Sequence, residues 1–447
     1  MEISDQTKEV GAMKKNDPKI INAWCSYDWA NSVYNLTITA AIFPVFYSAA
    51  TSDAFNGDVV DFFGFKIVNS VLYSYAISFS FLIIVFLSPI LSGIADYSGM
   101  KTRFMRFFSY LGSLGCIGLF FFTGANIEYG ILCAITASVG YAGALVFYNA
   151  FLPEIVTQDK MDGVSAKGFA LGYIGSVILL VASLVIIIFH ENFGLEQGFA
   201  TRLSFLQVGL WWFGFSHIAL HYLQDRPTGN KITSKILTKG FSEIKKVIAA
   251  LADNPNTQKF LTSFFFYSMG VQTVMLLAPL FGEKEIGMEG EKLIAVVLIL
   301  QIVAVLGAYS FAKISDHRGN KFAIGTAVFI WMLICVGGYL LQKESQFYGL
   351  AAVLGFVMGG IQALSRSTYS KMIPKDSKDT ASFFSFYDIT EKLAIVIGTF
   401  SYGIIEQITG SMRNSMIAMI MFFFAGFIFL MLAKLPKGKR QLLKTTP

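Results

Sequence analysis

Long stretches without a charged residue recur along the whole chain. Eleven stretches of at least 20 residues contain no Asp, Glu, Lys or Arg: 29–52, 67–95, 107–127, 129–153, 168–190, 203–224, 260–282, 293–312, 322–342, 345–365 and 414–433. A helix needs about 20 predominantly apolar residues to cross a bilayer, and in lipid its backbone must satisfy its own hydrogen bonds. Each stretch therefore predicts one membrane-spanning helix.

A twelfth apolar segment, from 380 to 409, differs because it contains charges. Asp388, Glu391, Lys392 and Glu406 interrupt it. Counting this segment, the pattern predicts an all-α integral membrane protein with twelve transmembrane helices. Residues 1–19 are polar and lack the apolar core and cleavage site of a signal peptide, so we expect the first helix to target the chain.

The longest hydrophilic stretch separates the sixth span from the seventh. Arg226, Pro227 and Gly229 break any helix there, and a basic segment at 239–250 could lie on the membrane surface. The expected division is a tail at 1–19, a six-helix bundle at 20–222, a central loop at 223–258, a second bundle at 259–434 and a tail at 435–447.

Composition and the placement of charge agree with a membrane protein. Only 14% of residues are charged, against about 25% in ordinary soluble proteins, and 54% are hydrophobic. With the N-terminus inside, 28 Lys and Arg fall in inner loops and 6 in outer loops. Inner loops retain Lys and Arg, so we predict a cell (inner) membrane protein with both termini in the cytoplasm. This asymmetry explains the net charge of +6 without a nucleic-acid partner.

Two short motifs recur at a nearly constant offset. The 2/3 loop and the 8/9 loop share Asp, Gly and Lys at an offset of 220, as Asp96, Gly99 and Lys101 and as Asp316, Gly319 and Lys321. A Tyr and a Pro recur at an offset of 221, as Tyr148 and Pro153 and as Tyr369 and Pro374. The two matches indicate duplication, and hence two pseudo-symmetric six-helix bundles related by an axis along the membrane normal.

These motifs resemble those of a known family. The loop from Gly93 to Arg103, its copy and the six-plus-six layout look like the major facilitator superfamily of secondary transporters. Further segments are similar to the permeases related to the autophagy-linked vacuolar amino-acid effluxer: 27–32, Phe43-Pro44, 148–154, 165–173 and 362–367. The resemblance covers roughly 20–435. It implies the major facilitator fold and alternating-access transport of amino acids or similar metabolites, with export as the direction.

Ionisable residues inside spans are the first candidates for a transport site, because each costs about 2.5–3.5 kcal/mol on insertion scales unless it faces a cavity or a partner. In the first helix, Asp28, Asn31 and Asn35 share one face, flanked by Tyr27 and Tyr34. We expect this face to line the central cavity, with Asp28 binding a cationic group or a proton. The alternative is a carboxylate that hydrogen-bonds a neighbouring helix.

The charged span at 380–409 is the second candidate. Asp388 and Lys392 are spaced i, i+4 for an ion pair, and Glu391 leaves an excess negative charge, for which Arg366 is a candidate partner. A purely structural pairing is the alternative to proton handling. The candidates for substrate binding are Tyr27, Asp28, Asn31, Tyr34, Asn35, Asn149, Gln362, Arg366 and Tyr387. Those for proton coupling are Asp28, Asp388, Glu391 and Lys392.

The two repeated loops are expected to act as gates. Asp96 would lie against the positively polarised N-terminus of the eleventh span, and Asp316 against the fifth span. The gating candidates are Asp96, Gly99, Lys101, Arg103, Asp316, Gly319 and Lys321. Lys101 and Arg103 have an alternative role as anchors on the positive side of the membrane.

Other kinds of chemistry lack support in the chain. His217 and His221 have a zinc-binding spacing but no third ligand, the four cysteines occur singly, and no GxxxxGK[ST] motif is present. The prediction is therefore a monomeric secondary active or facilitative transporter of a small solute, without cofactor or metal, in which H+ is the candidate coupling ion. The alternatives are a proton-coupled importer or drug exporter, and, in other classes, an integral-membrane enzyme acting on lipid or cell-wall precursors or a receptor.

Overall fold

The computed structural model describes residues 13–228, 230, 236–375 and 377–436, so most of both predicted tails lies outside the described residues. Nearly all of the described chain is helical. Its elements are α1 Pro18–Val33, η1 Tyr34–Ala41, α2 Phe43–Phe55, β1 Val59–Phe62, β2 Phe65–Val68, α3 Asn69–Ser98, α4 Lys101–Leu119, α5 Ile127–Ala150, α6 Leu152–Ile155, α7 Met161–Ile188, η2 His190–Phe193, α8 Gln197–Tyr222, α9 Ile236–Ala252, α10 Pro255–Ile286, α11 Gly290–Arg318, α12 Asn320–Leu340, α13 Glu344–Met372, α14 Thr380–Thr409 and α15 Met412–Leu432.

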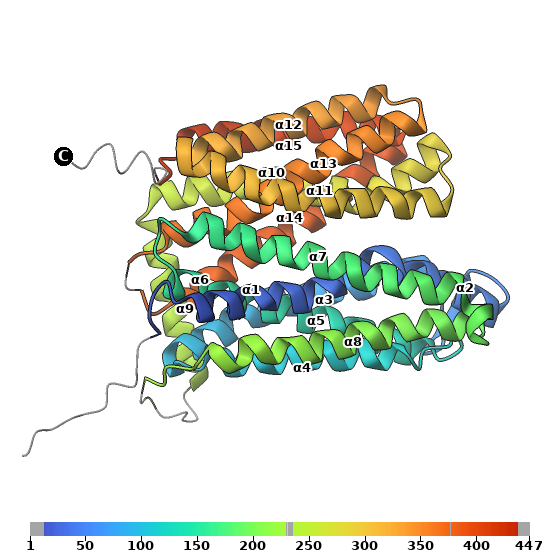
Figure 1. Cartoon of the computed structure of the whole chain (residues 1–447), viewed down its shortest axis with the longest axis horizontal. Helices are drawn as coiled ribbons and strands as arrows, with labels where there is room; N and C mark the ends of the chain where they lie inside the picture. The colour runs from blue at the N-terminus through green and yellow to red at the C-terminus, as the bar shows by residue number, and fades with distance from the viewer. Residues whose placement is uncertain (1–12, 229, 231–235, 376, 437–447) are drawn as a thin grey trace, which may run out of the picture.

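The long helices form two groups of six that lie side by side (Figure 1). We call α1 to α8 the N-half and α10 to α15 the C-half. Within the described residues, nine helices are long and apolar enough to cross a membrane, and α1, η1 and α2 together pass as one bent span. The charged α4 and α14 lie alongside them and complete twelve (Figure 1). The chain is an all-helical, multi-pass membrane protein.

The first span is not one straight helix. Asp17 caps it by accepting a hydrogen bond from the Lys19 backbone amide, and α1 passes directly into the π-helix η1. The axis then bends by 45° into α2, where Pro44 cannot donate a backbone hydrogen bond. π-Helical turns are rare and often occur at functional sites. The first span therefore changes direction part-way along its length.

The two ends of the bundle differ, and we name them by their elements. At the α9 end, α9 lies across the bundle, and the first and last described residues are close by (Figure 1). At the hairpin end, β1 and β2 form an antiparallel pair in which Val59 faces Val68 and Phe62 faces Phe65.

Helix α9 packs tightly against α3. Its Ile244 and Val247 are buried. Gly93 of α3 lies so close to Gly240 of α9 that a Cβ atom at Gly93 would collide with the Gly240 carbonyl. The basic segment predicted to rest on the membrane surface therefore lies across the end of the bundle, where it also contacts α10 and α14 of the C-half.

The halves meet along two seams. In one, α7 packs on α11 and α13, and in the other α14 packs on α3 and α5. Small buried side chains let the first seam close, with Ala166 beside Ala308, Ala312 and Ala363. The contacts across both seams define where the halves can separate.

Candidate functional site

A cavity of about 210 Å³ lies between the two halves. Both halves supply its walls, from α1, η1, α3, α5 and α7 on one side and α10, α11, α13 and α14 on the other. Its polar lining residues include Asp28, Asn31, Tyr34, Asn35, Tyr141, Asn149, Tyr173, Tyr267, Gln272, Gln301, Gln362, Arg366, Tyr387, Glu391 and Lys392. The cavity therefore presents charge of both signs in the middle of an apolar bundle.

The predicted polar face of the first span lines this cavity. Asp28 and Asn31 come from α1 and Asn35 from η1. The amide nitrogen of Asn31 is buried and has no hydrogen-bond partner among the described residues. Tyr27 does not line the cavity, because its hydroxyl lies 2.6 Å from Ser109 Oγ inside the N-half. The other predicted substrate-binding residues all line it.

The centre of the site is an ion pair that joins the halves. Arg366 Nη2 of α13 lies 3.0 Å from Asp28 Oδ2 of α1, and Nη1 lies 3.4 Å from Oδ1. Tyr148 donates a further hydrogen bond of 2.8 Å to Asp28. Both charged side chains are almost fully buried. The predicted partner for Arg366 was an acid of α14, but in the structure Arg366 reaches into the N-half.

The N-half holds the Arg366 side chain on several sides. Nε donates to Ser165 Oγ at 3.0 Å, and Nη2 donates to the Ser165 backbone carbonyl at 2.9 Å. The guanidinium also lies 4.1 Å from the ring centre of Phe169 and 4.8 Å from that of Trp24. These cation–π contacts and hydrogen bonds fix its direction.

A second charged group lies on α14. Lys392 Nζ is 3.4 Å from Asp388 Oδ1 and 3.7 Å from Glu391 Oε2, and Gln272 donates a 2.9 Å hydrogen bond to Glu391. Asp388 does not line the cavity, and its Oδ2 atom is buried with no hydrogen-bond partner among the described residues. Together with Asp28 and Arg366, the site has three acids and two bases, so one negative charge is in excess.

Uncharged polar contacts in the cavity escaped sequence reasoning. Tyr173 of α7 donates a 2.6 Å hydrogen bond to Gln362 of α13, which joins the halves, and the hydroxyls of Tyr267 and Ser365 lie 2.7 Å apart. The chain contains 19 tyrosines. A tyrosine in a span is inexpensive in lipid, so no sequence signal separates those in the cavity from those in the core.

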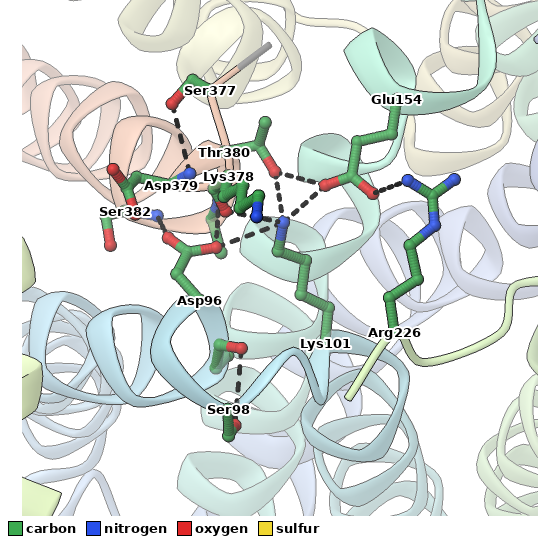
Figure 2. A network of polar contacts seen from close by, with 12 residues as sticks. Asp96, Ser98, Lys101, Glu154, Arg226, Ser377, Lys378, Asp379, Thr380 and Ser382 are labelled. Atoms are coloured by element: carbon green, nitrogen blue, oxygen red, sulfur yellow. Dashed lines mark hydrogen bonds and ion pairs between the residues drawn. The ribbon is translucent and has the colours of Figure 1, made fainter. Parts of the chain in front are cut away.

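At the α9 end, a first polar network bridges α3, α4 and α6 to the start of α14 (Figure 2). Asp96 accepts hydrogen bonds from the backbone amides of Ala381 and Ser382, at 3.2 and 2.7 Å. Lys101 lies 2.5 Å from Glu154 and 3.2 Å from Asp96, and donates to Thr380 Oγ1 at 2.6 Å. The carboxylate thus meets the positive end of the α14 dipole. We call this network the first gate, after the gating role that the sequence led us to expect for Asp96 and Lys101.

The other gating candidates of the 2/3 loop have different contacts. Gly99 ends α3 with φ of 71°, and its carbonyl accepts a 2.9 Å hydrogen bond from the Arg226 amide, so a side chain there would collide with the loop. Arg103 lies 3.6 Å from Asp225, which follows the N-half, and does not bridge the seam. Burial raises the pKa of Asp225.

A second gate is built on Asp162, in the first turn of α7. Its carboxylate accepts hydrogen bonds from four C-half side chains: Ser315 at 2.7 Å, Asn320 at 3.0 Å, Ser367 at 2.6 Å and Lys371 at 2.6 Å. Sequence reasoning missed this residue. The available signal was an acid in the first turn of a span that also begins near a repeated motif.

The repeated loop of the C-half lies next to this gate. Asp316 directly follows Ser315 at the end of α11, and Gly319 has φ of 85° between α11 and α12. Lys321 donates to the backbone carbonyls of Met431 and Ala433 at the end of α15, within the C-half. The hydrogen bonds described across this seam at the second gate are thus made by the carboxylate of Asp162, which belongs to α7.

Comparison with known proteins identifies the family. The family model described as "Vacuole effluxer Atg22 like" matches residues 16–443. The chain belongs to this family. A relative from Bacillus subtilis, the "Uncharacterized MFS-type transporter YxiO", is 31% identical over 94% of this chain and 95% of its own length. The "Autophagy-related protein 22-1" of Penicillium rubens is 22% identical over 86% of this chain and 78% of its own.

Solved structures agree on the fold of this Atg22-like chain. The fucose transporter FucP, in its outward conformation, has a TM-score of 0.68 at 15% identity, covering 92% of this chain and 98% of that one. The proton:xylose symporter XylE has a TM-score of 0.68 at 12% identity, covering 94% and 96%. The Atg22-like chain therefore has the major facilitator fold. Its family and its Bacillus subtilis relative identify it as a membrane transporter.

Proposed function

We propose that this Atg22-like protein moves a small amino-acid-like solute across the cell membrane by alternating access, with efflux as its direction. The observation that carries the proposal is the charged cavity between the halves. A solute with an ammonium and a carboxylate group can pair with Asp28 or Glu391 through one group and with Arg366 or Lys392 through the other. The unpartnered amide of Asn31 adds a donor. The family description, which names an effluxer, supports the direction.

The size of the cavity favours a small metabolite over a drug. Sites for drug-sized ligands measure about 300–1,000 Å³, whereas this cavity measures about 210 Å³. Its walls are tied together by the Tyr173–Gln362 hydrogen bond, which limits expansion across the seam. A drug exporter is therefore the weaker alternative.

The two gates support a state of the transport cycle in which one end of the cavity is closed. Both lie between the cavity and the α9 end, and both join the halves through buried charges. The α9 end is then the closed end, and the excess of Lys and Arg in its loops makes it the cytoplasmic one. Solute reaches the cavity from the hairpin end in this state.

Proton coupling is a second component that one observation favours. The site carries one excess negative charge, and Glu391 lines the cavity while Lys392 is shared with Asp388. Glu391 is therefore the residue that we expect to exchange protons with the cavity.

Counterflow in proteoliposomes tests the substrate class. Vesicles containing the full-length protein are preloaded with a mixture of amino acids and dipeptides, and uptake of each labelled compound is measured against protein-free vesicles. At least one amino acid should exchange. If no member of the mixture exchanges, the amino-acid assignment is wrong.

A matched pair of variants tests the proton assignment. Glu391→Gln should remove stimulation of uptake by a proton gradient while leaving solute exchange measurable. Glu406→Gln is the control, because Glu406 lies on the same helix but pairs with Lys284 outside the cavity. An unchanged pH dependence in Glu391→Gln would reject the assignment.

A further inference from the structure

The ion pair between Asp28 and Arg366 constrains the transport cycle as well as the site. Arg366 belongs to α13 of the C-half, yet its charged group is bound entirely by the N-half, through Asp28 and both oxygens of Ser165. The guanidinium is sandwiched against Phe169 and Trp24. The side chain of Arg366 therefore extends from the C-half into a binding site formed by the N-half.

Arg366 lies close to the end of the bundle where the two halves would separate. Arg366 is six residues before the end of α13 at Met372, so it lies about 9 Å from the α9 end of that helix at 1.5 Å per residue. Opening the α9 end separates α7 from α13, and this separation withdraws Arg366 from Ser165 and Asp28. Each charged group then loses its counter-charge at the same time, and Asp28 keeps only the hydrogen bond from Tyr148.

A buried charge without a partner is strongly unfavourable, because desolvation is no longer offset by attraction. The empty protein is therefore held with its α9 end closed. A zwitterionic solute changes this balance, since its carboxylate can pair with Arg366 while its ammonium pairs with Asp28. Both residues line the cavity, so a bound solute can reach each of them.

We propose that the Asp28–Arg366 pair makes the protein an obligatory exchanger, in which the α9 end opens only when a zwitterionic solute occupies the cavity and replaces the pair. The inference rests on the proposed function, because it requires such a solute. It adds that net movement without a returning solute is blocked. The gradients of the exchanged solutes then set the direction of net transport of each one.

Flux measurements in proteoliposomes test the exchange requirement. Labelled solute is followed out of preloaded vesicles, with the outside either free of solute or containing unlabelled solute. For the native chain, we expect efflux to be at least about tenfold faster with solute outside. This ratio corresponds to a difference of about 1.4 kcal/mol between the barriers of the empty and the loaded protein. Equal rates on both sides of this comparison would overturn the proposal.

Two substitutions weaken the pair without removing either charge. Ser165→Ala deletes the hydroxyl that accepts from Arg366 Nε. Gly168→Ala adds a Cβ that would lie 3.0 Å from Arg366 Nη2 and closer still to Asp28 Oδ2. Neither residue lines the cavity. Both variants should raise efflux into solute-free medium and bring its rate closer to that of exchange.

Controls come from the same helix. Ser183→Ala removes a hydroxyl whose described hydrogen bond is to Gln207 within the N-half, and Gly163→Ala adds a Cβ in open space. Both should keep the native ratio of exchange to net efflux. If Ser165→Ala and Gly168→Ala behave like these controls, the pair does not limit the empty cycle.

A conformational measurement decides the inference even if no tested solute moves. Lys160 and Lys375 are exposed and lie on opposite sides of the seam, the first just before α7 and the second just after α13. Spin labels at these positions report the separation at the α9 end. Without solute, the native protein should show one short distance, and Gly168→Ala should add a longer one. If no solute moves in the flux assay but Gly168→Ala adds the longer distance, only the proposed substrate class is rejected. An unchanged distance distribution in Gly168→Ala overturns the inference itself.

Discussion

Asp162 shows how a single carboxylate can be fixed between two halves of a transporter. It is almost fully buried and accepts hydrogen bonds from four side chains that come from three C-half helices, α11, α12 and α13. Lys371 supplies the counter-charge at 2.6 Å. Because every acceptor position has a donor, the charge remains stable within the seam.

Removing this charge should destabilise the closed seam. Asp162→Asn leaves the Lys371 ammonium buried without a counter-ion, and breaking such a pair costs about 3–5 kcal/mol. We expect a clear fall in the thermal unfolding midpoint of the purified protein, and recovery in Asp162→Asn combined with Lys371→Met. The exposed Asp253→Asn is the control. An Asp162→Asn protein as stable as the native one would contradict this account.

Individual charges in spans could be predicted because each is costly in lipid. Asp28, Arg366 and the acids of α14 stood out for this reason. Their partners could not be predicted, because an ion pair between α1 and α13 depends on the packing of helices more than 300 residues apart in sequence. The same dependence hid Glu154 and Asp162 as gate residues.

At the scale of elements, α9 is the component whose position the sequence left open. Its Ile244 and Val247 face the bundle, while Phe241, Lys245 and Ile248 are exposed. It contacts α3 in one half and α14 in the other. A helix placed in this way braces the closed end from outside the seams.

Separating α9 from α3 should loosen this brace. Gly240→Val places a branched side chain against Ile94, in a contact already at 3.0 Å for a Cβ atom. Overpacking costs about 1–3 kcal/mol, so we expect tryptic cleavage after Lys245 to accelerate about tenfold or more. Gly214→Val on α8, where a Cβ meets open space, should leave cleavage unchanged. Equal protection in both variants would show that α9 is held elsewhere.

The contact of α9 with the start of α14 should depend on pH. Burial raises the pKa of Asp379, and the neighbouring Glu243 carboxylate raises it further, while Lys246 and Lys101 oppose the change. An acid with a raised pKa binds its proton more tightly in the closed state than in the unfolded chain or an open state. Closure should therefore strengthen as the pH falls toward that pKa and weaken as it rises.

Spin labels at Lys160 and Lys375 can follow this effect between pH 8 and pH 5. The short distance should gain population at the acidic end in the native protein. Asp379→Asn should flatten the part of the response that this carboxyl group contributes. If Asp379→Asn keeps the full native response, other groups control the pH dependence.

Most elements followed from the hydrophobic pattern. Each charge-free stretch overlaps a long helix, and the predicted segment from 380 to 409 matches α14. The π-helix η1, the bend at Pro44 and the β-hairpin were not predicted. Each arises from a local backbone geometry that an apolar pattern does not encode, and the hairpin contains only four residues in each strand.

The whole molecule departs from its internal symmetry at the gates. In the first gate, Asp96 of α3 accepts a hydrogen bond from the backbone amide of Ser382 in α14. The offset of 220 between the repeats makes Asp162 the N-half equivalent of Ser382. In the second gate the acid therefore lies on α7 and its donors on the C-half. The carboxylate of this second network therefore lies outside the two repeated loops, on α7.

Sidedness of the whole molecule can be measured directly. In a Cys133→Ser background, Lys66→Cys at the hairpin end should react with an impermeant maleimide added to intact cells. Lys245→Cys on α9 should react only after the membrane is permeabilised. Both positions are exposed to solvent, so access depends on the side of the membrane. The reverse pattern would place the α9 end outside.

The first gate also determines which substitutions the protein can tolerate. Asp96 binds peptide amides, which every residue except proline supplies. In a saturation library selected for growth that requires transport, position 96 should accept almost no replacement. Ala381 contributes only its backbone to this contact, so its fully buried side chain can be replaced by other small apolar side chains. Sequence variation can therefore accumulate at Ala381, on the α14 side of the first gate, while Asp96 on the α3 side stays fixed.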